Sequence, residues 1–196
     1  KDRTIEAWTG GRDGKGVIHA TRTGYYIYKF IDPNLDLLQN RTSVHHWVIM
    51  RYAEILLSYA EAMNEAYGPT GNVGYRLNAV RALNQVRNRV GVEMPAVPTA
   101  ISKEELREKI RNERRVELAF EDHRFWDVRR WMIAEQEGVM SGAMYGIKIY
   151  WINSSPQEFR YTPYLYENRT FTKKMYLHPF STNEVNKGYL IQNPGY

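Results

Sequence analysis

The sequence predicts a mainly α-helical protein in which helical hairpins support long irregular loops and a few short strands. The first reason is a central stretch where apolar residues recur every three or four positions, as they do on one face of a helix. The second reason is that both flanking stretches are rich in glycine and tyrosine and contain several turn signals. We therefore divide the chain into an extended or loop region at 1–43, a helical core at 44–134 and a loop-rich segment at 135–196.

The first region contains turn signals and one candidate strand. Gly10-Gly11, Asp13-Gly14 and Asp32-Pro33-Asn34 are typical of turns. The segment from Gly24 to Phe30 is enriched in aromatic and β-branched residues, which favours a short strand or an extended piece.

The central stretch begins with two predicted helices. Apolar residues from Trp47 to Ala66 follow helical spacing, and Gly68-Pro69 ends that helix. A second apolar stripe runs from Leu77 to Val90, with Gly91 as the expected C-cap. Together the two helices resemble one tetratricopeptide unit in length, although the chain contains no second copy at that period.

A third helix has the clearest start signal in the sequence. Ser102 and Glu105 have the spacing of a capping box. We expect the helix to continue, after a break near Asp122-His123, as far as Ala134. Its apolar surface is expected to come from Leu106, Ile110, Val116, Leu118 and Phe120, followed by Phe125, Trp126, Val128 and Trp131.

The last segment is predicted to be mostly irregular. Residues Ile147 to Trp151 favour a short strand because β-branched and aromatic residues dominate there. The final residues, Tyr189 to Tyr196, are expected to lie extended along the body of the protein.

Composition and charge exclude several classes of protein. The chain has 196 residues and no cysteine, which excludes a disulfide framework, a thiolate zinc site and a cysteine nucleophile. The net charge of +5 is modest and its charges are mixed along the chain, so we expect no nucleic-acid partner. Aromatic residues make up 13% of the chain, and their flat faces suit core packing, large interfaces or stacking against sugar rings.

The sequence contains no recognisable catalytic or metal centre. Histidines such as His45 and His46 fall in no metal-ligand pattern, so we expect no metal and no cofactor. Glu113, Glu117 and Glu121 share a helix face with several arginines. Carboxylates on neighbouring turns of one helix cannot bracket a glycosidic bond, so this pattern favours ion pairs over acid–base catalysis.

A further set of charged residues lies among apolar neighbours in the predicted helices. We expect a partly buried ionic network that joins the helices through Arg51, Glu54, Glu61, Arg114, Glu117, Arg124 and Asp127. Helical spacing favours pairs of Glu117 and Glu121 with Arg114 and Arg124, and of Asp127 with Arg130.

Several segments, taken in order, resemble the SusD/RagB family from about Gly24 to the last residue. The helix from Arg51 to Glu65 is similar to one family signature, and the run from Asn112 through Trp131 is similar to a second. The intervening and C-terminal matches are Asn84 to Arg89, Tyr176 to Phe180, Asn183 to Val185, and Gln192 to Tyr196.

This resemblance implies a non-catalytic, surface-exposed lipoprotein of the outer membrane in Bacteroidetes-type bacteria. Such proteins cover a SusC-like TonB-dependent transporter and capture glycans for import, while one branch of the family captures peptides. The implied fold is mainly helical, with tetratricopeptide-like hairpins supporting long loops. The chain resembles only the C-terminal portion of the family, so the N-terminal lipid anchor is expected to lie upstream and outside it.

The family resemblance assigns no ligand-binding residue, so our candidates come from side-chain chemistry alone. Aromatic side chains on loops could stack against sugar rings, and the five that we select are Trp8, Tyr25, Tyr26, Trp151 and Tyr164. Three functions remain open at this point: glycan capture, peptide capture by the same architecture, and a helical protein–protein scaffold without a small ligand.

Overall fold

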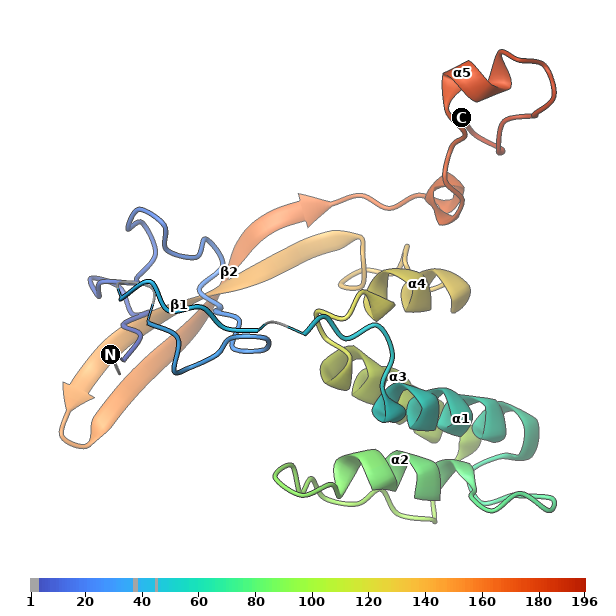
Figure 1. The fold of residues 1–196 in the computed structure, drawn as a ribbon, viewed down its shortest axis with the longest axis horizontal. Coiled ribbons are helices and arrows are strands. Elements are labelled where there is room, and N and C mark those ends of the chain that lie inside the picture. The colour runs from blue at the N-terminus through green and yellow to red at the C-terminus, as the bar shows by residue number, and fades with distance from the viewer. Residues whose placement is uncertain (1–3, 37–38, 45) are drawn as a thin grey trace. The chain divides into compact units, whose positions relative to one another are not determined.

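A computed structural model describes residues 4–36, 39–44 and 46–196 of the chain (Figure 1). Residues 1–3 and 37–38 lie outside the described residues, as does His45, one of the histidines considered above. The described part contains five α-helices, one 3₁₀ helix and one two-stranded sheet, which agrees with a mainly α class. It divides into a helical unit at 46–127 and a second unit formed by 1–45 and 128–196.

Three helices build the core of the helical unit. α1 spans Tyr52–Tyr67, α2 spans Ala79–Arg87 and α3 spans Lys103–Glu117, and α1 packs against both of the others. Their apolar stripes meet in one cluster because the buried positions recur at helical spacing. Its largest fully buried apolar members are Leu57, Leu83, Leu106, Ile110, Leu118 and Val80. The likeness of α1 and α2 to a tetratricopeptide unit stays a prediction.

Both ends of the first helical pair differ from the sequence prediction. α1 begins at Tyr52 instead of Trp47, because Arg51 is extended, with φ −147° and ψ 161°. α2 ends at Arg87, with Asn88 as its C-cap, and Val90 is 95% exposed instead of lying on the buried stripe. The predicted C-cap Gly91 has φ +82°, but it lies in the turn after the helix. Apolar spacing alone therefore predicted both helices to be longer than they are, because apolar residues at helical spacing continue beyond the core.

The predicted capping box of α3 is confirmed. The Ser102 hydroxyl accepts a hydrogen bond from the Glu105 amide at 3.1 Å, and the Glu105 carboxylate accepts one from the Ser102 amide at 3.0 Å. Val116 and Phe120 are exposed, contrary to the expected apolar surface. The expected break is also present, since α3 ends at Glu117 and Phe120 has φ +63°.

After the break, α4 spans His123–Arg130. It ends four residues before the predicted end at Ala134, and a turn follows in which Met132 has φ +54°. Two short helices complete the C-terminal part, η2 at Lys173–Tyr176 and α5 at Thr182–Val185.

The second unit contains a long β-hairpin that the sequence prediction largely missed. β1 spans Gly142–Ser154 and pairs antiparallel with β2, which spans Gln157–Arg169. The predicted short strand at Ile147 to Trp151 is therefore the middle of a strand of 13 residues. Two register irregularities, near Met144/Tyr145 and Trp151/Asn153, interrupt the alternation by which a strand is recognised in a sequence.

The N-terminal segment lies against β1 without forming a strand (Figure 1). The Thr9 amide donates to the Ile149 carbonyl at 2.7 Å, and the Ile147 amide donates to the Thr23 carbonyl at 2.7 Å. The candidate strand at Gly24 to Phe30 is therefore irregular chain, because it contributes no ladder of hydrogen bonds. None of the helices in the described part of the chain combines the length and apolar character that a membrane-spanning helix requires.

Candidate ligand-binding sites

Two of the predicted aromatic residues meet on the hairpin. Trp8 packs edge-on against Trp151 with ring centroids 4.6 Å apart, and both rings contact Phe159, at 5.5 Å and 5.8 Å. Trp151 and Phe159 are cross-strand partners in the β1–β2 register, and the hydrogen bond from Thr9 to Ile149 holds Trp8 beside them. We call Trp8, Trp151, Phe159 and Tyr161 the aromatic cluster, since Tyr161 extends it at 6.5 Å from Phe159.

The aromatic cluster combines fixed rings with exposed surface. Trp151 is 42% exposed, and Tyr161 is exposed as well, so part of the ring surface is open to solvent. Edge-to-face packing restricts the orientation of each ring before any ligand binds. Phe159 and Tyr161 were not among the predicted candidates, although pairing β2 with β1 in the observed register would have identified both.

Tyr164 does not belong to the aromatic cluster and lines a pocket elsewhere in the same unit. Its ring carries the Lys15 ammonium 3.5 Å from the ring centroid, and its hydroxyl donates to the Arg22 carbonyl. The pocket of about 590 Å³ is lined by Tyr164, Tyr166 and the segment from Lys15 to Arg22. One face of the Tyr164 ring is therefore already occupied by a cation, which leaves less of it for a ligand.

The two remaining candidates do not join the aromatic cluster. The Tyr26 hydroxyl donates to the Asp13 carbonyl at 2.6 Å and accepts from the Thr21 amide at 3.3 Å, which indicates a structural role in the loop. Tyr25 is exposed, and its amide donates to the Thr23 hydroxyl. The structure thus brings together Trp8 and Trp151 and places Tyr25, Tyr26 and Tyr164 elsewhere on the N-terminal segment and the hairpin.

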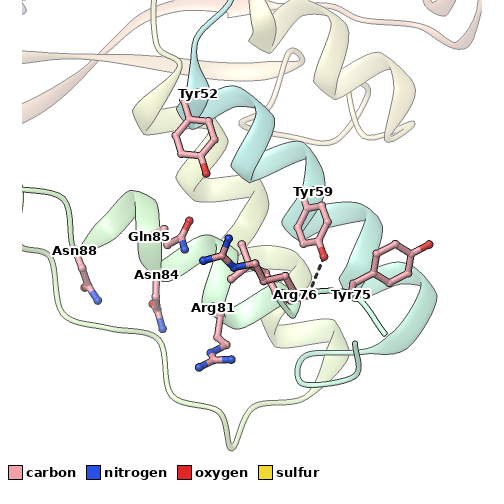
Figure 2. A pocket seen from close by; sticks show the side chains of 9 residues that line it. Tyr52, Tyr59, Tyr75, Arg76, Arg81, Asn84, Gln85 and Asn88 are labelled. Atoms are coloured by element: carbon pink, nitrogen blue, oxygen red, sulfur yellow. Dashed lines mark hydrogen bonds between the residues drawn. The ribbon is translucent and has the colours of Figure 1, made fainter. Parts of the chain in front are cut away.

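A larger pocket lies in the helical unit, beside α1 and α2 (Figure 2). Its volume is about 1080 Å³, at the upper end of the range found for small-molecule sites. The sequence prediction assigned none of its lining residues to a ligand site; they are Tyr52, Tyr59, Tyr75, Arg76, Leu77, Arg81, Asn84, Gln85 and Asn88. We call it the α1–α2 pocket.

Two of these side chains shape the α1–α2 pocket. The Tyr59 hydroxyl donates to the Leu77 carbonyl at 2.8 Å, a contact visible in Figure 2. Asn84 forms two hydrogen bonds with the backbone of Val97, at 2.8 Å and 2.9 Å. These bonds attach the loop before α2 to α1, and the loop after α2 to α2 itself, so the walls of the pocket are held by the fold.

The predicted ionic network is present, but with different partners. Arg51 binds Glu117 at 2.6 Å and Glu121 at 2.7 Å, so the two glutamates pair across helices and not with Arg114 and Arg124 as predicted. Arg89 also binds Glu117. The tertiary contact replaces the helical one because the break after α3 redirects the following residues.

Two further contacts extend the predicted network. Asp127 accepts two hydrogen bonds from Arg114, at 2.9 Å and 3.1 Å, and its predicted pair with Arg130 stays a prediction. Glu54 lies with one oxygen 3.6 Å from the His123 imidazole. Four carboxylates of this network therefore face a basic side chain: those of Glu54, Glu117, Glu121 and Asp127.

Electrostatics gives no support to a catalytic acid pair in α3. Burial by itself raises the pKa of Glu117, but hydrogen bonds from Arg89 and Arg51 outweigh it and leave the pKa below its usual value. Glu113 is held by Arg87 and Glu121 by Arg51. A general acid needs a raised pKa. Among the residues that the structure describes, no group of three or more acidic or histidine side chains could hold a metal ion.

Comparison with solved structures first defines the class of protein. A SusD-like protein from Bacteroides fragilis NCTC 9343 superposes with a TM-score of 0.60 at 38% sequence identity, covering 76% of this chain and 26% of that one. The part of the chain that superposes therefore has a SusD-like fold. A family model described as the SusD family matches residues 4–196, and the chain belongs to that family.

Two curated relatives come from Formosa agariphila. SusD-like protein P2 is 35% identical over 111 residues, which is 54% of this chain and 20% of the relative. SusD-like protein P38 is 35% identical over 89 residues, which is 42% of this chain and 16% of the relative. The aligned part of the chain thus spans a fifth or less of the length of these relatives.

Proposed function

We propose that the chain is part of a non-catalytic protein that captures glycans at the cell surface and delivers them to a SusC-like TonB-dependent transporter. Membership of the SusD family supports this function, since the family resemblance implies nutrient binding. Outer-membrane location and a lipid anchor belong to the same proposal. Protease treatment of intact cells tests the location, because a surface protein is degraded while periplasmic proteins survive.

The observation that carries the glycan assignment is the aromatic cluster. Trp8, Trp151 and Phe159 form a packed group whose ring surfaces are partly open, and Tyr161 extends it along β2. Aromatic faces bind the apolar faces of sugar rings without charge, and rings fixed in advance lose little conformational entropy on binding. The hairpin carries Trp151, Phe159 and Tyr161 on paired strands, and the hydrogen bond from Thr9 to Ile149 holds Trp8 beside them.

Titration calorimetry with a panel of neutral oligosaccharides tests this platform. We expect Trp151→Ala to lower the affinity for the glycan by about tenfold, equivalent to about 1.4 kcal/mol of binding free energy, because one stacked ring is lost. Tyr28→Ala is the matched control, since this exposed aromatic lies outside the aromatic cluster and both pockets. Unchanged affinity in a folded Trp8→Ala/Trp151→Ala variant would reject the aromatic cluster as the platform.

A peptide is the alternative ligand, and the hairpin edge favours it. In the described part of the chain the sheet consists of β1 and β2, so no further strand pairs with the outer edge of β2. An extended peptide can add a strand to such an edge. The same titration with short peptides distinguishes the two ligands. Peptide binding at the edge of β2 should persist in Trp151→Ala, and it should be lost when a further proline in β2 removes a backbone N–H from that edge.

A further inference from the structure

We propose that the α1–α2 pocket is a second saccharide site, which takes an anionic sugar bearing a carboxylate or sulfate group. The pocket is lined by two arginines, three tyrosines, three amide side chains and Leu77, and by no acidic residue. This inference rests on the proposed function, because it assigns a charge class to the captured glycan.

The pairing of arginines in the helical unit supports an anionic ligand. Six arginines of this unit each bind a carboxylate of the fold: Arg51, Arg87, Arg89, Arg107, Arg111 and Arg114. Within the described residues, the guanidinium groups of Arg76 and Arg81 have neither an ion pair nor a hydrogen bond. A guanidinium group that lines a pocket can bind carboxylate or sulfate oxygens through paired hydrogen bonds.

The neutral side chains of the pocket suit a polyhydroxylated ligand. The amides of Gln85 and Asn88 form no side-chain hydrogen bond within the described part of the chain. Each amide can therefore donate hydrogen bonds to sugar hydroxyls and accept hydrogen bonds from them. In Figure 2 the Arg76 side chain extends from the loop before α2 toward the side of the helix that carries Gln85. Tyr52 is 70% exposed, and its ring offers a stacking face at the rim.

The same lining argues against an acidic peptide. Extended peptides add to sheet edges and helical peptides fill apolar grooves, and the described part of the helical unit contains no strand. Arginine clusters also bind acidic peptide motifs, so poly-glutamate is the competing ligand in the test below. Leu77 is the one aliphatic side chain among the lining residues, so a peptide would find little surface for its own apolar groups. A charged saccharide needs only the arginines, amides and aromatic rings that are present.

Titration with oligogalacturonate, an oligomer of a uronic acid, tests this inference against a neutral galactose oligomer of equal length. We expect the Arg76→Gln/Arg81→Gln variant to bind oligogalacturonate at least about tenfold more weakly than the unmodified protein. Added salt should weaken the uronate complex of the unmodified protein and leave a neutral complex unchanged.

The matched control is Lys109→Gln/Arg115→Gln. It removes the same net charge from exposed positions of α3 that do not line the pocket. Equal losses of affinity in the two double variants would show that only overall charge matters, and would overturn the proposed site. Absence of uronate binding, or full affinity in the Arg76→Gln/Arg81→Gln variant, would also overturn it. Equal binding of poly-glutamate with the same arginine dependence would overturn the saccharide assignment.

The two proposals fail in distinguishable ways. Binding of the neutral oligomer that is lost in Trp151→Ala but unaffected by Arg76→Gln/Arg81→Gln supports the aromatic cluster whatever happens at the α1–α2 pocket. Uronate binding that depends on the two arginines but not on Trp151 supports the α1–α2 pocket even if the aromatic cluster is rejected. Failure of every saccharide to bind would reject both.

Discussion

Arg51 shows how a single side chain joins two parts of the helical unit. It donates to the carboxylates of Glu117 and Glu121 and to the Glu117 carbonyl. The Glu121 side chain is only 2% exposed, so its charge is stabilised by this guanidinium and not by water. An extended backbone at Arg51 places the side chain there and fixes where α1 begins.

Removal of Arg51 should therefore destabilise the helical unit. We expect Arg51→Ala to lower the free energy of unfolding by about 2–3 kcal/mol, because a buried carboxylate loses its partner. Glu108→Ala is the control, since Glu108 is 70% exposed in its pair with Arg111 and should contribute under about 0.5 kcal/mol. Urea unfolding followed by circular dichroism measures both, and equal midpoints would contradict the prediction.

The lowered pKa of Glu117 makes stability depend on pH. Its pKa in the folded chain lies below the value of an unfolded glutamate, so the unfolded state binds protons more readily. The stabilisation is therefore complete above the unfolded pKa, about 4.3, and is lost as the pH falls through the folded pKa. We expect Glu117→Gln to flatten the fall in melting temperature between pH 5 and 3. Glu93→Gln, at an exposed position, should reproduce the unmodified profile.

At the scale of single elements, the capping box determines where α3 starts. Ser102→Ala should lower the free energy of unfolding by about 1 kcal/mol, because the Glu105 amide loses its acceptor. Thr99→Ala changes an exposed residue of the preceding turn and should have little effect. A thermal melt that places the two variants together would count against the cap.

The hairpin and the N-terminal segment meet at a buried glycine. A Cβ atom on Gly146 would lie 2.7 Å from the Thr23 carbonyl oxygen and 2.8 Å from the Tyr164 ring. Gly146→Ala should therefore cost about 1–3 kcal/mol and separate the segment from β1. Faster tryptic cleavage at Lys15 and Arg22 would report this, with Thr162→Ala on exposed β2 surface as the control. Cleavage at the control rate would show that the close approach does not hold the segment.

Helices were easier to predict than the hairpin for a physical reason. Leu56, Ala60 and Met63 are buried at helical spacing within α1, so a local pattern indicates a tertiary core. Both faces of β2 are largely exposed, and Pro163 lies within it, so neither alternation nor composition marks it as a strand. Its partner β1 is what makes β2 a strand, and pairing between separate segments is not visible in a local pattern.

The candidate sites follow the same distinction. Trp8 and Trp151 were selected as exposed aromatics, but their contact depends on a hairpin register and on a segment distant in sequence. The α1–α2 pocket was missed because its arginines are ordinary surface residues in the sequence. Their lack of carboxylate partners among the described residues becomes evident only once six other arginines of the helical unit are paired in three dimensions.

At the scale of the whole molecule, the two units differ in how much apolar core they contain. The helical unit holds one large cluster of buried residues, whereas the cluster around Val128, Ala134 and Phe171 in the other unit is small. Local opening requires less free energy where fewer apolar contacts are lost. We expect amides of α1 and α3 to exchange most slowly with deuterium, and those near Ser154 and Gln157 to exchange fastest within the hairpin. Equal protection in both units would contradict this ranking.

The contact between the N-terminal segment and the hairpin has a consequence for synthesis of the chain. Arg22 and Tyr164 are 142 residues apart in sequence, and all of the helical unit is translated between them. At a translation rate of about 5–20 residues per second, the ribosome makes the partner strand β2 on the order of ten seconds after the N-terminal segment. The helical unit, whose residues 46–127 are all translated by then, can form during that interval. A nascent chain would therefore complete the α1–α2 pocket first and the aromatic cluster last.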